Sequence, residues 1–125
     1  MTKRVLVVED NELNLKLFCD LLKAHGFETD AVRDGRDAYG RARAFGPDLI
    51  ITDIQLPHVT GIELIGELRG DEALAAVPIM AVTAYAGVGD EGRIRDAGAN
   101  AYVSKPISVM RFMDVVNSLI ETPAR

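Results

Sequence analysis

Short, continuous apolar runs alternate along this chain with longer segments in which apolar residues recur every three or four positions. The short runs indicate β-strands covered on both faces, and the longer spacing indicates amphipathic helices. Five strands are predicted, of which the second has the weakest pattern, at residues 3–8, 27–32, 49–53, 79–83 and 101–104.

Two helical stripes are the strongest of the amphipathic patterns. The first predicted helix is followed by Gly26 as a stop, and its stripe consists of Leu13, Leu17, Phe18, Leu21 and Leu22. The last predicted helix has Ser108 as its cap, and its stripe consists of Val109, Phe112, Met113, Val116, Leu119 and Ile120. Both stripes are expected to face a hydrophobic core.

Capping residues mark two further helices. Asp34 is expected to cap a helix that ends near Phe45, because its carboxylate can accept from backbone N–H groups of the first turn. Thr60 and Glu63 have the spacing of a capping box and predict a helix that runs to about Arg69.

A strand followed by a helix recurs five times if residues 87–97 form a short helix. The glycines in that segment weaken it, by roughly 1 kcal/mol each relative to alanine. The alternation predicts an α/β fold, a doubly wound (βα)5 domain with a five-stranded parallel sheet and right-handed crossovers. Residues 1–125 are expected to form this one domain, with no leader segment and no attached effector domain.

Composition narrows the function classes. The formal net charge of −5 argues against a nucleic-acid partner, because phosphate backbones select basic surfaces. No apolar run approaches the roughly 18 residues of a membrane span. Cys19 is the only cysteine, which excludes an intrachain disulfide, and it is interpreted as a packing residue. A cytoplasmic location is expected.

Residues that can do chemistry stand where the predicted strands end, namely Glu9, Asp10, Asp53, Thr83 and Lys105. The carboxyl ends of parallel strands share one edge of the sheet, where ligands bind in open α/β folds. Three carboxylates gathered there would repel one another without a cation, and oxygen ligands suit Mg²⁺. The sequence therefore predicts a magnesium site at this edge.

Three functions are compatible with such a site: a binding module switched by phosphorylation, a Mg²⁺-dependent phosphohydrolase, and a flavodoxin-like flavin carrier. Asp53 can attack a phosphoryl group, while Mg²⁺ and Lys105 supply positive charge and Thr83 a hydroxyl donor. Gln55 follows where such hydrolases usually need a second aspartate, and the acids after the first strand would repel a flavin phosphate. The binding module is therefore the favoured interpretation.

Two features near the predicted site are interpreted conservatively. His58 is expected to be a surface loop residue, because Mg²⁺ prefers oxygen ligands to imidazole. Most bonds before proline are trans, and the sequence leaves the isomer of the Lys105–Pro106 bond open.

The ordered set of motifs resembles the receiver domain of two-component response regulators, the CheY-like group, along the whole chain. The resemblance is carried by Glu9-Asp10, Asp53-Ile54-Gln55-Leu56-Pro57, Gly61, Thr83-Ala84 and Lys105-Pro106. It implies the strand order 2-1-3-4-5. Leu56 departs from the commoner methionine. Residues 8–14 and 103–108 are most similar to stand-alone receivers that act in cell-cycle and polarity control.

The resemblance implies a role for each site residue. Asp53 would be the phosphoacceptor, supplied by a sensor histidine kinase or a phosphotransfer protein of a phosphorelay. Mg²⁺ would be held by Glu9 (mainly through a water molecule), Asp10, Asp53 and the carbonyl of Gln55. Thr83 and Lys105 would bind the phosphoryl oxygens. The protein would then be no enzyme toward other substrates and would catalyse only its own phosphorylation and dephosphorylation.

The resemblance also implies an output surface. Tyr102 matches the switch aromatic, which turns inward as Thr83 moves toward the phosphoryl group. Protein targets would bind the face made by the fourth helix, fifth strand and fifth helix, which would include Tyr85, Asp90 and Ile107.

Gln55 and Tyr85 stand at the positions that tune the lifetime of the acyl phosphate in the family. Both side chains can restrict water, so we expect slower self-dephosphorylation than with small residues there. Phosphoryl decay measured in the wild type and in the Gln55→Ala, Tyr85→Ala double variant checks this. Equal decay rates would contradict it.

Overall fold

The structure is a computed structural model that describes residues 2–84 and 90–121. Its strands form one parallel sheet in the order β2-β1-β3-β4-β5. The strands are β1 (Arg4–Val8), β2 (Glu28–Val32), β3 (Leu49–Asp53), β4 (Ile79–Thr83) and β5 (Ala101–Ser104). The helices are α1 (Glu12–Ala24), α2 (Gly35–Phe45), α3 (Gly61–Arg69), α4 (Asp90–Ala97) and α5 (Val109–Glu121). The expected fold class and strand order are confirmed.

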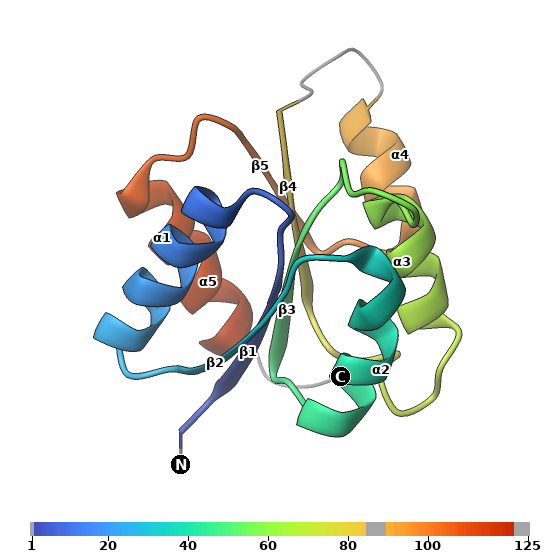
Figure 1. Ribbon diagram of the computed structural model, residues 1–125, viewed down its shortest axis with the longest axis horizontal. Helices are drawn as coiled ribbons and strands as arrows, with labels where there is room; N and C mark the ends of the chain where they lie inside the picture. Colours follow the sequence, from blue (N-terminus) through green and yellow to red (C-terminus); the bar gives the residue numbers. More distant parts are fainter. Residues whose placement is uncertain (1, 85–89, 122–125) are drawn as a thin grey trace.

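Helices cover both faces of the sheet (Figure 1): α1 and α5 lie on one side, and α2, α3 and α4 on the other. Each side has its own hydrophobic cluster, built from alternate residues of the central strands. Leu6 and Ile50 point to the α2–α4 side, whereas Val7 and Ile51 point to the α1–α5 side. Every residue of β3 is buried, as the absence of alternation in its sequence predicts.

The predicted caps are present. Asp34 is the N-cap of α2 and its side chain accepts from the N–H of Arg36. Thr60 and Glu63 form a complete capping box at the start of α3. The predicted helix over residues 87–97 begins at Asp90 in the described part of the chain, and residues 87–89 lie outside it.

The structure corrects the predicted stripes at their edges. Leu13, Leu17 and Val109 are exposed rather than buried. The face of α1 that contacts the core instead consists of Leu15, Phe18, Cys19 and Leu22. The apolar residues of α1 cover a wider arc than the sheet can bury, so one edge of the stripe stays in solvent.

The Lys105–Pro106 bond is cis, the less common isomer, whereas the sequence leaves the isomer open. None of the helices in residues 2–84 and 90–121 has the length and apolar content needed to cross a bilayer.

Aromatic stacking joins α1 to α5. The rings of Phe18 and Phe112 lie 4.8 Å apart and nearly parallel, and both are fully buried. Such a pair stabilises the fold through buried area and through ring contact. It holds the two helices whose first turns flank the carboxyl edge of the sheet.

Truncation of Phe112 should therefore be costly. We expect Phe112→Ala to lower the free energy of unfolding by about 3–5 kcal/mol, because it removes a buried ring and leaves a cavity. Met110→Ala, on an exposed position of the same helix, should change it by less than about 0.5 kcal/mol. Urea unfolding of both variants measures the difference. Similar losses in the two variants would contradict the assignment of Phe112 to the core.

Candidate functional site

The carboxyl edge of the sheet gathers the residues that the sequence singled out. Glu9 and Asp10 follow β1, Asp53 ends β3, Thr83 ends β4, and Lys105 follows β5. These strands are neighbours in the sheet, so residues far apart in sequence meet at one place. Carboxylate oxygens of Glu9, Asp10 and Asp53 all lie within 4.8 Å of one another.

Lys105 joins two of the carboxylates. Its Nζ lies 2.7 Å from Asp53 Oδ2 and 3.0 Å from Glu9 Oε1. The other oxygen of Asp53 accepts from the N–H of Gln55 at 2.9 Å. Glu9 is 1% exposed and Asp53 is 3% exposed, whereas Asp10 faces solvent. Asp53 is thus a buried carboxylate with both oxygens held in place.

The balance of charge in the site is negative, since three carboxylates face one ammonium. Burial and the neighbouring Asp53 raise the pKa of Glu9 to about 7, although Lys105 and the N–H of Asn11 partly oppose the shift. Burial disfavours the charged form of Lys105, but its bonds to Asp53 and Glu9 outweigh that and raise its pKa. Carboxylates therefore outnumber ammonium groups in this cluster.

The donor set fits Mg²⁺. Oxygens from Glu9, Asp10 and Asp53 are hard ligands within reach of a single small cation. Glu9 Oε1 accepts no hydrogen bond in the described part of the chain, and its approach to Lys105 is an ion pair without hydrogen-bond geometry. A buried oxygen in this state has spare capacity for a cation. The carbonyl of Gln55 is the fourth ligand predicted from sequence, and nothing in the contacts tests it.

The loop after β3, residues 54–60, is attached at both of its ends. The N–H of Ile54 donates to the carbonyl of Val82, and the N–H of Gly61 donates to the carbonyl of Ile54. A Cβ atom on Gly61 would overlap the carbonyl oxygen of Asp53 and the Cα of Ile54. Glycine is required here because α3 begins directly against the backbone of Asp53 and Ile54.

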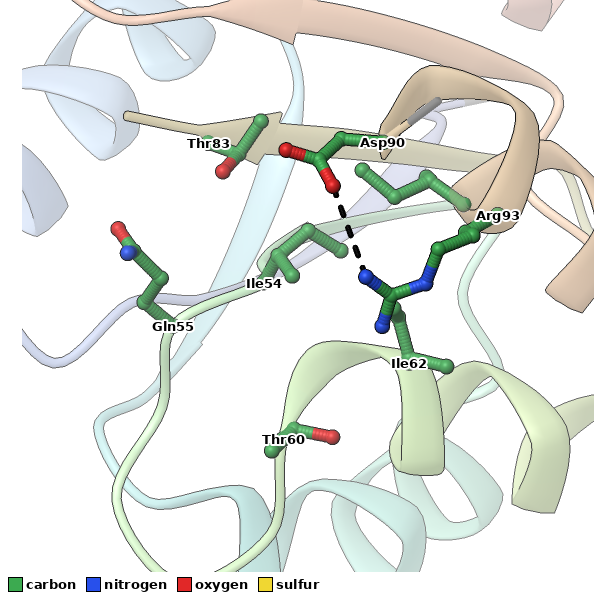
Figure 2. A pocket seen from close by; sticks show the side chains of 8 residues that line it. Ile54, Gln55, Thr60, Ile62, Thr83, Asp90 and Arg93 are labelled. Carbon is green, nitrogen blue, oxygen red and sulfur yellow. Dashed lines mark ion pairs between the residues drawn. The ribbon is translucent and has the colours of Figure 1, made fainter. Parts of the chain in front are cut away.

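A cavity of about 360 Å³ lies beside this loop (Figure 2), and Thr83 is on its wall. Its apolar side chains come from the loop after β3, from α3 and from α4, and Arg93 of α4 pairs with Asp90 at 3.5 Å. The lining residues are Ile54, Gln55, Thr60, Ile62, Thr83, Asp90, Arg93 and Ile94. The space separates α4 from the loop that follows Asp53.

The predicted switch residue Tyr102 and the predicted output residue Ile107 pack on opposite faces of the sheet. Tyr102 is partly buried and packs against the hydrophobic cluster of the α2–α4 side. Burial, with Asp90 and Glu91 nearby, raises the pKa of its hydroxyl. Ile107 packs against the cluster of the α1–α5 side, and Tyr85 lies outside the described residues.

Sequence patterns did not indicate two polar contacts. His58 is exposed, as predicted, but it contacts Asp34 across 24 positions of sequence. Arg69 donates to the carbonyls of Gly98 and Val77 and to Asn100 Oδ1, and so joins α3 to the turns before β4 and β5. Periodicity in the sequence does not predict these contacts, because the partners of the loop histidine and of the arginine lie far away along the chain.

Comparison with known proteins identifies relatives of the chain. The family model described as the response regulator receiver domain matches residues 5–117. The polar-differentiation response regulator DivK of Brucella ovis is 54% identical over 120 residues, which cover 96% of this chain and 98% of that protein. DivK of Brucella anthropi is 52% identical over the same coverage.

Two solved structures are also similar to this chain. The receiver domain of sensor histidine kinase PA1611 from Pseudomonas aeruginosa, with a magnesium ion coordinated in the active site cleft, is 31% identical with a TM-score of 0.89. The match covers 98% of this chain and 100% of the Pseudomonas domain. Chemotaxis response regulator CheY4 of Vibrio cholerae shares the fold with a TM-score of 0.90, at 24% identity and coverage of 95% and 99%.

The raised pKa of Glu9 predicts a pH dependence of stability without metal. The folded pKa of about 7 exceeds the usual 4.5, so the folded state binds more protons than the unfolded state between these values. The contribution of Glu9 to stability is therefore full below about pH 4.5 and is lost as pH rises through 7.

Unfolding in EDTA at pH 5 and pH 8 measures this dependence. The stability of the wild type relative to Glu9→Gln should fall by roughly 2–3 kcal/mol over that range. Glu67→Gln, which removes an exposed carboxylate of α3, is the control. The stability of the wild type relative to this variant should be the same at both pH values. Mg²⁺ should abolish the decline, because a cation favours the ionised form of Glu9. A decline that persists in Glu9→Gln would assign it to another group.

Proposed function

This chain belongs to the family of response regulator receiver domains, and on that premise we propose that it is a phosphorylation-dependent signalling switch of a two-component phosphorelay. Asp53 accepts a phosphoryl group from a phosphohistidine of a sensor histidine kinase or a phosphotransfer protein. The observation that carries the proposal is the buried carboxylate of Asp53, held by Lys105 and the N–H of Gln55 beside two other carboxylates.

The transfer step is a displacement at phosphorus. An oxygen of Asp53 forms the new O–P bond while the P–N bond of the donor breaks, and the electron pair stays on the imidazole nitrogen, which takes up a proton. The Lys105 ammonium lies 2.7 Å from Asp53 Oδ2 and is therefore close enough to bind the incoming phosphoryl oxygens. The Thr83 hydroxyl at the end of the next strand donates to them.

Magnesium is the cofactor of this proposal. Glu9, Asp10, Asp53 and the carbonyl of Gln55 would hold the ion, and the negative, incompletely bonded cluster supports that role. When bound, Mg²⁺ would neutralise charge on the transferring phosphoryl oxygens. The magnesium-containing receiver of the Pseudomonas kinase supports the same assignment.

Phosphorylation is proposed to change the output face. Thr83 moves toward the phosphoryl group and Tyr102 turns inward, on the side of the sheet that contains the cavity beside α4. The free space beside Thr83 and the small size of α4 favour such a shift, because a weakly held element has few contacts to lose. The face of α4, β5 and α5, including Tyr85, Asp90 and Ile107, would then alter its affinity for protein targets.

An apolar patch beside the site supports docking of the phosphoryl donor. Leu13 and Met110, in the first turns of α1 and α5, are 80% and 77% exposed, and Leu17 and Val109 extend the patch. Both helices begin at the carboxyl edge of the sheet, which is the edge where Asp53 lies. A helical donor domain could bury these side chains while presenting its histidine.

The biological setting follows from the relatives. Their name, polar-differentiation response regulator, supports a role in cell-cycle and polarity control. The acidic net charge supports protein partners rather than nucleic acid, and a cytoplasmic protein is proposed. Gln55 and Leu56 stand where a phosphohydrolase needs a second aspartate, so the chain is proposed to catalyse only its own phosphorylation and dephosphorylation.

Phosphorylation by a small donor tests the proposal. Wild-type protein incubated with Mg²⁺ and acetyl phosphate should gain the mass of one phosphoryl group, because Asp53 is the buried nucleophile of the site. Asp53→Asn should gain none, and EDTA should abolish the gain in the wild type. Asp96→Asn, which changes an exposed carboxylate of α4, is the matched control and should behave as the wild type. Equal phosphorylation of Asp53→Asn would refute the assignment.

A further inference from the structure

The loop between β3 and α3, residues 54–60, places Gln55 beside the site, and its residue Leu56 is buried in the core. Its ends are held by the bond from Ile54 N–H to Val82 and by that from Gly61 N–H to Ile54. Between them, Gln55 N–H donates to Asp53 Oδ1 at 2.9 Å. The position of Gln55 therefore depends on what restrains the rest of the loop.

His58 lies at the turn of this loop in a left-handed conformation, with φ of 70°. It is the only residue other than glycine with positive φ in the described part of the chain. L-residues with a Cβ atom rarely adopt this conformation, and surrounding contacts must maintain it. A specific contact must therefore hold His58 in this conformation.

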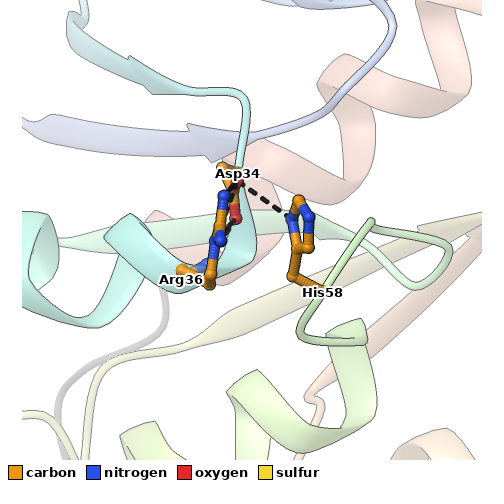
Figure 3. Close-up of polar contacts among 3 residues, drawn as sticks. All are labelled: Asp34, Arg36 and His58. Carbon is orange, nitrogen blue, oxygen red and sulfur yellow. Dashed lines mark hydrogen bonds and ion pairs between the residues drawn. The ribbon is translucent and has the colours of Figure 1, made fainter.

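Asp34 supplies that contact (Figure 3). Its Oδ2 lies 3.2 Å from Nδ1 of His58, while Arg36 donates to both oxygens of the same carboxylate. The hydrogen bonds from the Arg36 side chain and backbone lower the pKa of Asp34 to about 2, so the carboxylate stays charged. Asp34 is also the N-cap of α2, so the restraint is anchored in a helix terminus.

The next pair of residues packs just as closely. A Cβ atom on Gly35 would lie 2.5 Å from the carbonyl oxygen of Val59, so α2 begins directly against the loop. Two consecutive residues, Asp34 and Gly35, thus contact two consecutive residues, His58 and Val59. One contact is polar and the other steric, and together they fix the turn of the loop against α2.

We propose that His58 and Asp34 are a positioning pair that holds the loop of residues 54–60 and thereby sets the backbone of Gln55 for Mg²⁺. The inference rests on the proposed function, since it assigns the ion to Gln55. Neither residue touches the ion. The pair acts through the loop, and its loss lets the Gln55 carbonyl move away from the carboxylates that share the cation.

The test uses variants that spare the local backbone. Asparagine tolerates the left-handed conformation, so His58→Asn removes the imidazole without new strain. Serine remains a good N-cap but is too short to reach residue 58, so Asp34→Ser keeps α2 and removes the contact. His25→Asn makes the same change at the other histidine, whose Nδ1 contacts the carbonyl of Leu21 at the far end of α1.

Two measurements separate positioning from general stability. Calorimetric titration gives the dissociation constant for Mg²⁺, and the amide resonance of Gln55 in metal-free protein reports the loop. We expect His58→Asn and Asp34→Ser each to weaken Mg²⁺ binding about two- to fivefold and to shift that resonance. The double variant should match either single variant, because each single variant already removes the contact between His58 and Asp34. His25→Asn should match the wild type.

The outcomes distinguish this inference from the proposed function. Additive effects in the double variant, or unchanged binding and an unshifted Gln55 resonance in the single variants, would overturn the positioning pair. If wild-type protein binds no Mg²⁺ at millimolar concentration, the proposed function fails. The Gln55 resonance of metal-free protein then still decides whether the pair holds the loop.

Discussion

The mutual repulsion of buried carboxylates, offset by a single lysine, is the interaction on which the rest of the site depends. Glu9 and Asp53 are almost fully removed from water, and Lys105 Nζ lies within 3.0 Å of both. Burial of an unpaired charge is costly, so the arrangement persists only while Lys105 or another cation balances it. Burial and the neighbouring Asp53 raise the pKa of Glu9, and the three carboxylates form a donor set that would suit a divalent ion.

The parallel sheet makes this balance possible. Neighbouring strands all end at one edge, so Glu9, Asp53 and Lys105, contributed by β1, β3 and β5, meet without long side chains having to cross the fold. The hydrophobic clusters on the two faces keep the strands buried up to that edge. The polar residues are therefore desolvated by the core and are positioned by strands that it holds rigid.

The two faces of the sheet contribute differently to the edge. On the α1–α5 side, the Phe18–Phe112 stack joins helices that leave apolar side chains exposed beside the site. On the α2–α4 side, a cavity lies beside Thr83, and the N-terminus of α2 contacts the loop after Asp53. We propose that one side provides the surface for a phosphoryl donor, and that the other provides the space and the restraints that bear on switching.

The sequence by itself determined the elements, the caps at Asp34 and Thr60, and the residues that gather at the carboxyl edge of the sheet. These are local signals: a strand without alternation, a Thr-Glu capping box, or an acid directly after an apolar run. Once the alternation of strands and helices implies a parallel sheet, the meeting of Glu9, Asp53 and Lys105 follows from topology.

Only the tertiary structure decided which edge of each apolar stripe is buried, because Leu13 and Leu15 are equally apolar and the sheet covers only one of them. It also decided the cis bond before Pro106 and the contact between His58 and Asp34. Such features depend on residues many positions apart, and their energies come from packing geometry that no periodicity in the sequence records.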